Sequence, residues 1–194
     1  MNDRRELAEL VLETLQAGIV PWRYPFNVTP EFKPLFGQFF TGEPLVEAKA
    51  DYAELDAIIA ATGARITRHW RVVKPRCERP PQDRILLPPR SRFWTEAQFQ
   101  ASRIHEVLHF LEQPWRVGWI GSDHQSEMVC EIGTALIESH FRLTHDTDDT
   151  NNRKWLSAWT NGISADPDYL FDAIAHAERS VNYLLGLKTI KEAA

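Results

Sequence analysis

The sequence predicts an α+β fold, in which a small, mostly antiparallel sheet packs on one long helix and the C-terminal half is helical. Apolar side chains recur at helical spacing in several segments, whereas residues 64–73 and 84–87 carry the β-branched, aromatic and aliphatic side chains typical of strands. After residue 95, every segment is predicted as helix or loop. With 194 residues and 43% hydrophobic content, the chain is long enough for one domain with a substantial core.

The helices are predicted from apolar positions three and four residues apart and from their boundary residues. Asp51 and Thr95 are expected N-caps, and Gly18 and Gly63 are expected to end the helices that precede them. The expected helices cover residues 4–17, 51–62, 95–113, 123–141, 151–161 and 167–186.

The two strand-like segments, residues 64–73 and 84–87, are joined by the Pro-rich polar stretch 74–83. This order predicts an antiparallel hairpin with a long, irregular connection.

The composition is that of a globular protein with a modest negative charge. The net charge of −5 and the sequence pI of about 5.8 argue against a strongly basic nucleic-acid binder and leave room only for a local basic patch. The charged N-terminus lacks the apolar stretch of a signal peptide, and no apolar run is long enough to cross a membrane. We therefore expect a cytoplasmic protein without membrane contact. Of the two cysteines, Cys77 and Cys130, the second is expected to be a buried thiol in a helix.

Residues 105–109 read His-Glu-Val-Leu-His, an HExxH pattern within a predicted helix. Residues four apart on a helix differ by about 40° around its axis, so the rings of His105 and His109 can reach one metal ion. Glu106 is then placed to act as the general base on a water molecule at that metal. An HExxH pattern can also arise by chance on a solvated helix face, but here Ile104 and Leu108 give the helix an apolar side.

A catalytic zinc site usually takes three protein ligands, and the next predicted helix offers Glu127 and Glu131 on one face. One carboxylate can bind the metal while the other hydrogen-bonds the outer nitrogen of a ligand histidine. We predict that Glu127 is the third ligand and Glu131 the outer partner of one Zn²⁺ ion per chain; exchanged roles are the alternative. HExxH followed by ExxxE is the thermolysin-like, or gluzincin, pattern, which predicts a zinc metallopeptidase acting on a protein substrate.

Several separated motifs resemble a known family. The order of residues 86–90 (LLPPR), the HExxH helix and the Glu127–Glu131 helix with Gly133 is similar to the zincin-like metallopeptidase domain of ArdC-type antirestriction proteins, also called the polyvalent-protein metallopeptidase domain. The resemblance covers roughly residues 52–186, and the corresponding domain is placed at residues 51–190. It implies a zincin-like fold and a protein of a mobile genetic element.

Residues 15–23 are similar to the opening of the family's N-terminal domain, which binds single-stranded DNA. In the family that domain is much longer, so residues 1–50 are interpreted as a shortened form of it. Trp22 and Arg23 are the candidate contacts for single-stranded DNA, by stacking and by charge. The alternative is that this aromatic stretch packs across the domain.

A competing hypothesis is a non-catalytic antirestriction or DNA-binding module in which zinc only holds two helices together. The net charge of −5 is compatible with a DNA mimic, although weakly so for 194 residues.

Overall fold

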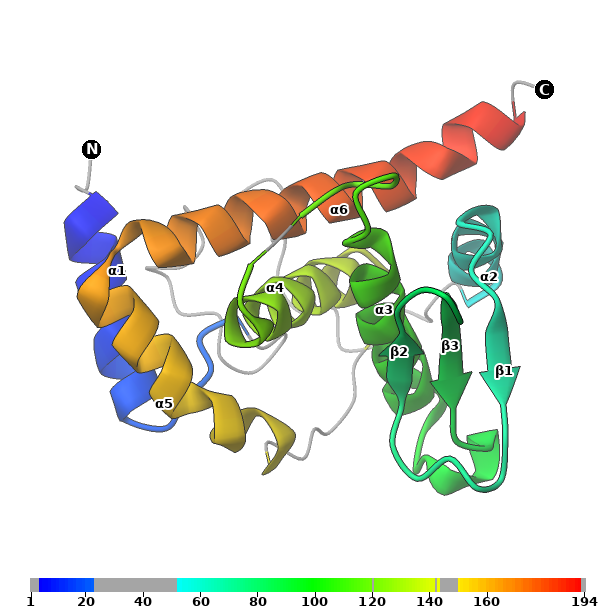
Figure 1. The fold of residues 1–194 in the computed structure, drawn as a ribbon, viewed down its shortest axis with the longest axis horizontal. Coiled ribbons are helices and arrows are strands. Elements are labelled where there is room, and N and C mark those ends of the chain that lie inside the picture. The colour runs from blue at the N-terminus through cyan, green and yellow to red at the C-terminus, as the bar shows by residue number, and fades with distance from the viewer. Residues whose placement is uncertain (1–3, 23–51, 120, 142, 144–149, 193–194) are drawn as a thin grey trace.

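The molecule places a small sheet at one end and two paired helices at the other, with a central helix between them (Figure 1). The computed structural model describes residues 4–22, 52–119, 121–141, 143 and 150–192. Along these residues run the helices α1 (Arg4–Gln16), α2 (Tyr52–Ala61), α3 (Glu96–Leu111), α4 (Asp123–Phe141), α5 (Thr150–Ala165) and α6 (Asp168–Glu192), the strands β1 (Ile66–Arg68), β2 (Arg76–Glu78) and β3 (Arg84–Leu87), and a short 3-10 helix, η1 (Arg90–Arg92). The predicted α+β class with a helical C-terminal half is confirmed.

The sheet is mixed, with strand order β1-β3-β2. β1 pairs with β3 in parallel, with Ile66 opposite Ile85, and β2 pairs with β3 antiparallel, with Cys77 opposite Ile85. The predicted hairpin between residues 64–73 and 84–87 is therefore wrong, and so is the expectation of a mostly antiparallel sheet. The cause is β2, which lies within the Pro-rich stretch expected to be a loop and occupies the antiparallel position beside β3.

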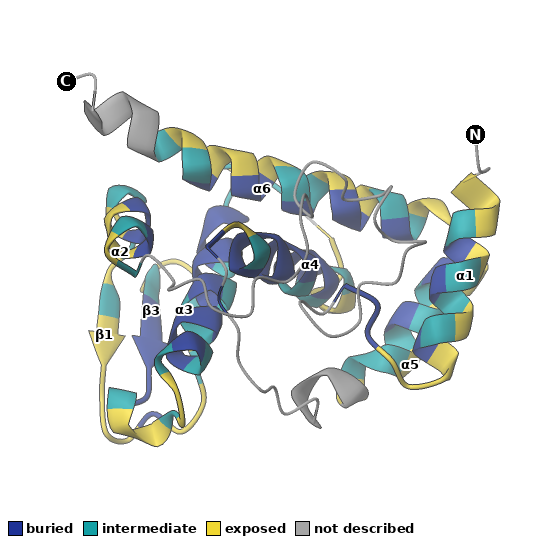
Figure 2. Ribbon diagram, turned by 180° about the vertical axis from the view of Figure 1, so that it is seen from behind, coloured by how far each residue is buried: buried dark blue, intermediate teal, exposed yellow. Residues whose placement is uncertain are grey.

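The central strand and two central helices form the core. Ile85 and Leu87 of β3 are fully buried beneath α3, and α4 is buried along most of its length (Figure 2). Gly133 allows α4 to approach α3 closely, because a Cβ atom there would lie 2.9 Å from Cδ1 of Leu108, a side chain that is itself buried. The approach of α3 and α4 brings the HExxH pattern and the paired glutamates onto facing surfaces.

The N-terminal residues that the structure describes belong to the same core. α1 packs on α5, and Val11 and Leu15 are buried in the cluster that also holds residues of α3, α4 and α6. The expected boundary between residues 50 and 51, and the expected N-cap Asp51, lie outside the described residues. The interpretation of residues 1–50 as a shortened DNA-binding segment stays a prediction.

No helix among the residues described above is both long and apolar enough to cross a membrane.

Candidate metal site

Two turns of α3 present the HExxH histidines to α4. Thr95 begins the helix as predicted, because its side chain accepts a hydrogen bond from the backbone N–H of Gln98. The rings of His105 and His109 lie edge to face, and their Nε2 atoms are 3.2 Å apart. Both Nε2 atoms therefore meet at one point.

Glu127 of α4 faces this meeting point. Its Oε2 lies 3.7 Å from Nε2 of His105, and its Oε1 lies 3.7 Å from Nε2 of His109. One ligand atom from each of these three residues falls within 4.8 Å of the others. Glu131 lies instead on the outer side of His105, where its Oε1 is 3.3 Å from Nδ1.

His109 also has a carboxylate on its outer side, which reasoning from the sequence missed. Glu112, at the end of α3, places Oε1 3.4 Å from Nδ1 of His109 and is only 6% exposed. The same Oε1 accepts a hydrogen bond of 2.5 Å from Ser126, while the Cys130 thiol lies 3.3 Å from Nδ1. The signal was the three-residue spacing from His109 to Glu112, which puts the two side chains on neighbouring turns of the helix.

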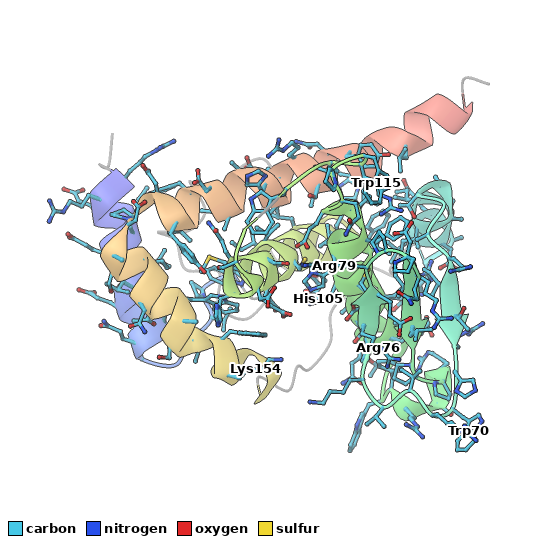
Figure 3. All side chains as sticks on the ribbon, in the orientation of Figure 1. Trp70, Arg76, Arg79, His105, Trp115 and Lys154 are labelled. Carbon is cyan, nitrogen blue, oxygen red and sulfur yellow. The ribbon has the colours of Figure 1, made fainter. Side chains whose placement is uncertain are left out.

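Hydrogen bonds and positive charge around Glu112 stabilise its ionised form. Burial raises its pKa, but the hydrogen bond and charge of His109 and the hydrogen bonds from Ser126 and Cys130 outweigh this, so the pKa lies below the usual value. Arg79, in the β2–β3 connection, places Nη2 3.8 Å from Oε2 of Glu112 (Figure 3). The outer partner of His109 is thus an ionised carboxylate.

Glu106, the candidate general base, points to the sheet side of α3 and is 7% exposed. Burial raises its pKa, and the carboxylate of Glu127 adds to this, whereas His105, His109 and a hydrogen bond to the backbone of Cys77 lower it; the net pKa is raised. A carboxylate with a raised pKa holds a proton more readily than an exposed one, as a general base that later acts as an acid must.

The histidine and carboxylate of the site shift each other's pKa in opposite directions. Burial lowers the pKa of His105, but the hydrogen bond to Glu127 and the charges of Glu131 and Glu106 raise it to about 9. Burial raises the pKa of Glu127, but His105, His109 and Lys154 lower it below its usual value. This cluster of carboxylates attracts positive charge to the point between the two rings.

His124 and His176, two further histidines of the C-terminal half, do not belong to this cluster. The His124 ring meets Trp155 edge to face, and its backbone carbonyl accepts a hydrogen bond from Trp159. On α6, the His176 ring packs beside the ring of Trp119 and contacts Arg179 of the same helix. Neither belongs to the group of residues whose ligand atoms converge.

The candidate DNA contacts near the N-terminus differ in what can be said of them. Trp22 is 2% exposed, and its ring packs on Trp159 with centroids 5.6 Å apart. The structure therefore offers no face of this ring for stacking on a base. Arg23 lies outside the described residues.

Two curated relatives are DNA primases named TraC from Escherichia coli. One is 27% identical over 138 residues, which cover 68% of this chain and 13% of the relative. The other is 24% identical over 164 residues, covering 78% of this chain and 11% of the relative. The chain thus spans little more than a tenth of the length of these curated relatives.

Among solved structures, the antirestriction protein ArdC of plasmid R388 is similar in its metal-free and its Mn(II)-bound forms. In both cases the TM-score is 0.74 at 17% identity, over 96% of this chain and 98% of the other. At this identity the likeness shows that the two proteins share a fold. The model of a family described as zincin-like metallopeptidase matches residues 53–176, well over half of the chain and including all of α3 and α4. The chain therefore belongs to the zincin-like metallopeptidase family.

Proposed function

We propose that this chain is a zinc-dependent metallopeptidase of the gluzincin type that hydrolyses peptide bonds in a protein substrate. The observation that carries the proposal is the convergence of Nε2 of His105, Nε2 of His109 and the carboxylate of Glu127. Family membership supports the same reaction class.

The donor set fits a zinc ion. Two imidazole nitrogens and one carboxylate oxygen are a known set of catalytic zinc ligands that leaves a further position open. A second convergent group, formed by His109, Glu112 and Cys130, also has metal-binding side chains. A metal bound there would use the outer nitrogen of His109, and the Glu112 carboxylate already accepts a hydrogen bond from Ser126. This second group is therefore better suited to orient His109 than to bind the metal itself.

A divalent ion is also supported by the Mn(II)-bound form of the similar ArdC protein. The imidazole-rich set with one carboxylate favours zinc over the harder ions that prefer all-oxygen sites. We therefore propose zinc as the resident ion, at one per chain.

A zinc ion held by these ligands would polarise a substrate carbonyl and lower the pKa of a water molecule. Glu106 would accept the proton of the attacking water and later deliver it to the amine that leaves. The raised pKa of Glu106 suits both roles, because a group whose pKa lies closer to neutral pH can more readily both accept and donate a proton.

Two carboxylates would hold the ligand rings in place. Glu131 faces Nδ1 of His105, and Glu112 faces Nδ1 of His109. A carboxylate on the outer nitrogen fixes the tautomer, so that Nε2 is free to bind the metal. Glu112 thus extends the predicted site by one residue.

The test of catalysis is cleavage of fluorescein-labelled casein by the zinc-loaded chain and by Glu106→Gln. Loss of a general base should lower the rate by about 10²- to 10⁴-fold, while zinc content stays unchanged. Glu13→Gln, which removes an exposed carboxylate from α1, is the matched control and should retain full activity. Equal cleavage by the wild type and Glu106→Gln would refute the peptidase mechanism.

A second candidate function is a non-catalytic antirestriction or DNA-related role, in which the metal only joins α3 and α4. The names of the similar proteins, an antirestriction protein and a DNA primase, favour it. The discriminating observation is inhibition of a restriction endonuclease by Glu106→Gln. Full inhibition by this variant would support contact without catalysis, whereas loss of inhibition would support a proteolytic role.

A further inference from the structure

Positive charge is concentrated in one part of this acidic chain. Residues 65–94 hold nine Lys and Arg against two Asp and Glu, whereas the whole chain holds 22 against 27. The remaining residues are therefore strongly acidic, with 13 basic side chains against 25 acidic ones. This segment contains β1, β2, β3 and η1, so the positive charge belongs to the sheet end of the molecule.

The connection after β1 carries an exposed aromatic ring among these cations. Trp70 is 63% exposed, and its ring is flanked by the imidazole of His69, stacked at 27°, and by the guanidinium of Arg71, 4.8 Å from the ring centre. A second ring, that of Trp94, is 94% exposed two residues after the end of η1. We name the side chains of residues 68–74 together with Trp94 the sheet-tip surface.

Hydrogen bonds from an arginine of η1 hold this connection in place. Arg92 of η1 donates from Nη1 to the carbonyl of Val72 at 3.1 Å and from Nη2 to the carbonyl of Trp70 at 2.8 Å. The backbone N–H of Val72 in turn donates to the carbonyl of His69. These bonds restrain the connection before any ligand binds, which lowers the entropic cost of binding.

The cations of the sheet-tip surface are not neutralised by neighbouring carboxylates. Elsewhere in the segment, Arg76 and Arg84 pair with Glu78, and Arg90 pairs with Glu96. In the part of the chain that the structure describes, Arg68, Arg71 and Lys74 have no acidic partner within ion-pair distance. These three side chains are exposed and keep their charge for a ligand.

We propose that the sheet-tip surface binds single-stranded nucleic acid, with Trp70 and Trp94 stacking on bases and Arg68, Arg71 and Lys74 contacting phosphates. Exposed rings interleaved with unpaired cations are the pattern that such ligands require. The cations are at least as many as the exposed apolar side chains and alternate with them along the chain. This alternation suits a nucleic-acid strand, which carries one charge per nucleotide, better than it suits a lipid surface. Trp70 lies at the far end of the sheet from His105, so the surface is separate from the candidate metal site (Figure 3).

The test is fluorescence anisotropy of a labelled 25-nucleotide oligo-dT with the whole chain, at low and at moderate salt. Trp70→Ala should weaken binding by about tenfold, the lower part of the range for one stacked base. Arg71→Glu with Lys74→Glu should weaken it further and make the slope of log K against log salt shallower by about 1.4, since each phosphate contact to a single strand contributes about 0.7.

Matched controls separate this surface from general effects. Trp115→Ala removes a ring with the same 63% exposure from the other end of α3, and Arg4→Glu with Arg5→Glu makes the same change of charge on α1. Both should bind oligo-dT like the wild type, and circular dichroism should show every variant folded. No binding by the wild type at low salt, or equal weakening by the controls, would overturn the proposal. Binding to anionic phosphatidylserine vesicles without binding to oligo-dT would overturn it in favour of a lipid surface.

Discussion

The facing surfaces of α3 and α4 and the sheet-tip surface both carry many charges. The charges between the helices are largely buried and paired, whereas those of the sheet-tip surface are exposed and lack acidic partners among the residues described. Between the helices, every ring nitrogen of His105 and His109 has a carboxylate within 4.0 Å, and these side chains are largely buried. At the sheet tip, exposed cations lie beside exposed rings without acidic partners among the residues described. Charges that are buried and paired hold a fixed geometry, whereas exposed and unpaired charges remain available to a large, flexible ligand.

The two regions also differ in which structural feature determines their function. The site between the helices depends on distances set by packing, because α3 and α4 approach at Gly133. The sheet-tip surface depends on composition within one connection and on a single anchoring residue, Arg92. Changes to packing should therefore damage the first region and leave the second unaffected.

The sharpest way to break this account is to separate the roles of the three site glutamates. Glu127→Gln should weaken zinc binding by more than about a hundredfold, because it removes a ligand. Glu131→Gln and Glu112→Gln should each weaken it by only about ten- to a hundredfold, the usual effect of an outer partner. Competition with a fluorescent zinc chelator measures all three. A larger loss for Glu131→Gln than for Glu127→Gln would mean that the two carboxylates exchange roles.

The buried pairing should also give the metal-free chain a characteristic pH dependence. The pKa of His105 is raised from 6.5 to about 9, so the folded chain holds this proton more tightly than the unfolded chain. The resulting stabilisation is complete below about pH 6.5 and is lost as pH rises to about 9; it amounts to at most about 3 kcal/mol.

Urea unfolding at pH 6 and pH 9.5 in the presence of a chelator measures this loss. His105→Asn should flatten the dependence, and His140→Asn, at an exposed position on α4, should keep it. A metal-free wild type whose stability is the same at both pH values would contradict the pairing between His105 and the carboxylates.

Gly133→Val tests the packing that brings the two helices together. Its side chain would meet Leu108, which is buried and has little room to move, so we expect a loss of about 1–3 kcal/mol in the free energy of unfolding. Gly186→Ala, on α6, is the control, because nothing lies within 4 Å of the added Cβ. If Gly133→Val unfolds at the same urea concentration as the wild type and binds zinc equally well, the close approach is not what positions the site.

The smallest expected effect concerns the independence of the two regions. Trp70→Ala should change the free energy of unfolding by less than about 0.5 kcal/mol and should leave zinc affinity unaltered, because the ring is mostly exposed and lies far from α4. Thermal unfolding and the chelator competition check both. A clear drop in zinc affinity would show that the regions are coupled.

The sequence was most informative where periodicity was long. The helices at residues 4–17, 95–113 and 123–141 lie within a few residues of α1, α3 and α4, because each carries an apolar stripe over several turns. The strands were harder, since β1 and β2 have three residues each, too few for a period of two to be visible. Nothing local indicates that β1 pairs in parallel with β3; that choice is made by the insertion of β2 at the sheet edge.

The candidate site, like the fold, could be predicted from the sequence only in part. The spacing of His105 and His109, and of Glu127 and Glu131, predicts which side chains share a face of one helix, and the structure brings the two faces together. Their roles stay predictions. The three-residue spacing places Glu112 beside His109, but the hydrogen bond from Ser126, which orients the Glu112 carboxylate, comes from the opposite helix and cannot be read from that spacing. A relation between two helices is decided by packing, which one segment of sequence does not contain.

The zinc content of the chain tests the central claim most directly. Protein purified without chelators, dialysed against zinc and analysed by inductively coupled plasma mass spectrometry should hold about one zinc ion per chain. His105→Ala should hold almost none, whereas His140→Ala, which removes an exposed histidine from α4, should still hold about one. A folded wild type that never retains zinc, or a His105→Ala variant that retains as much as the wild type, would contradict the account.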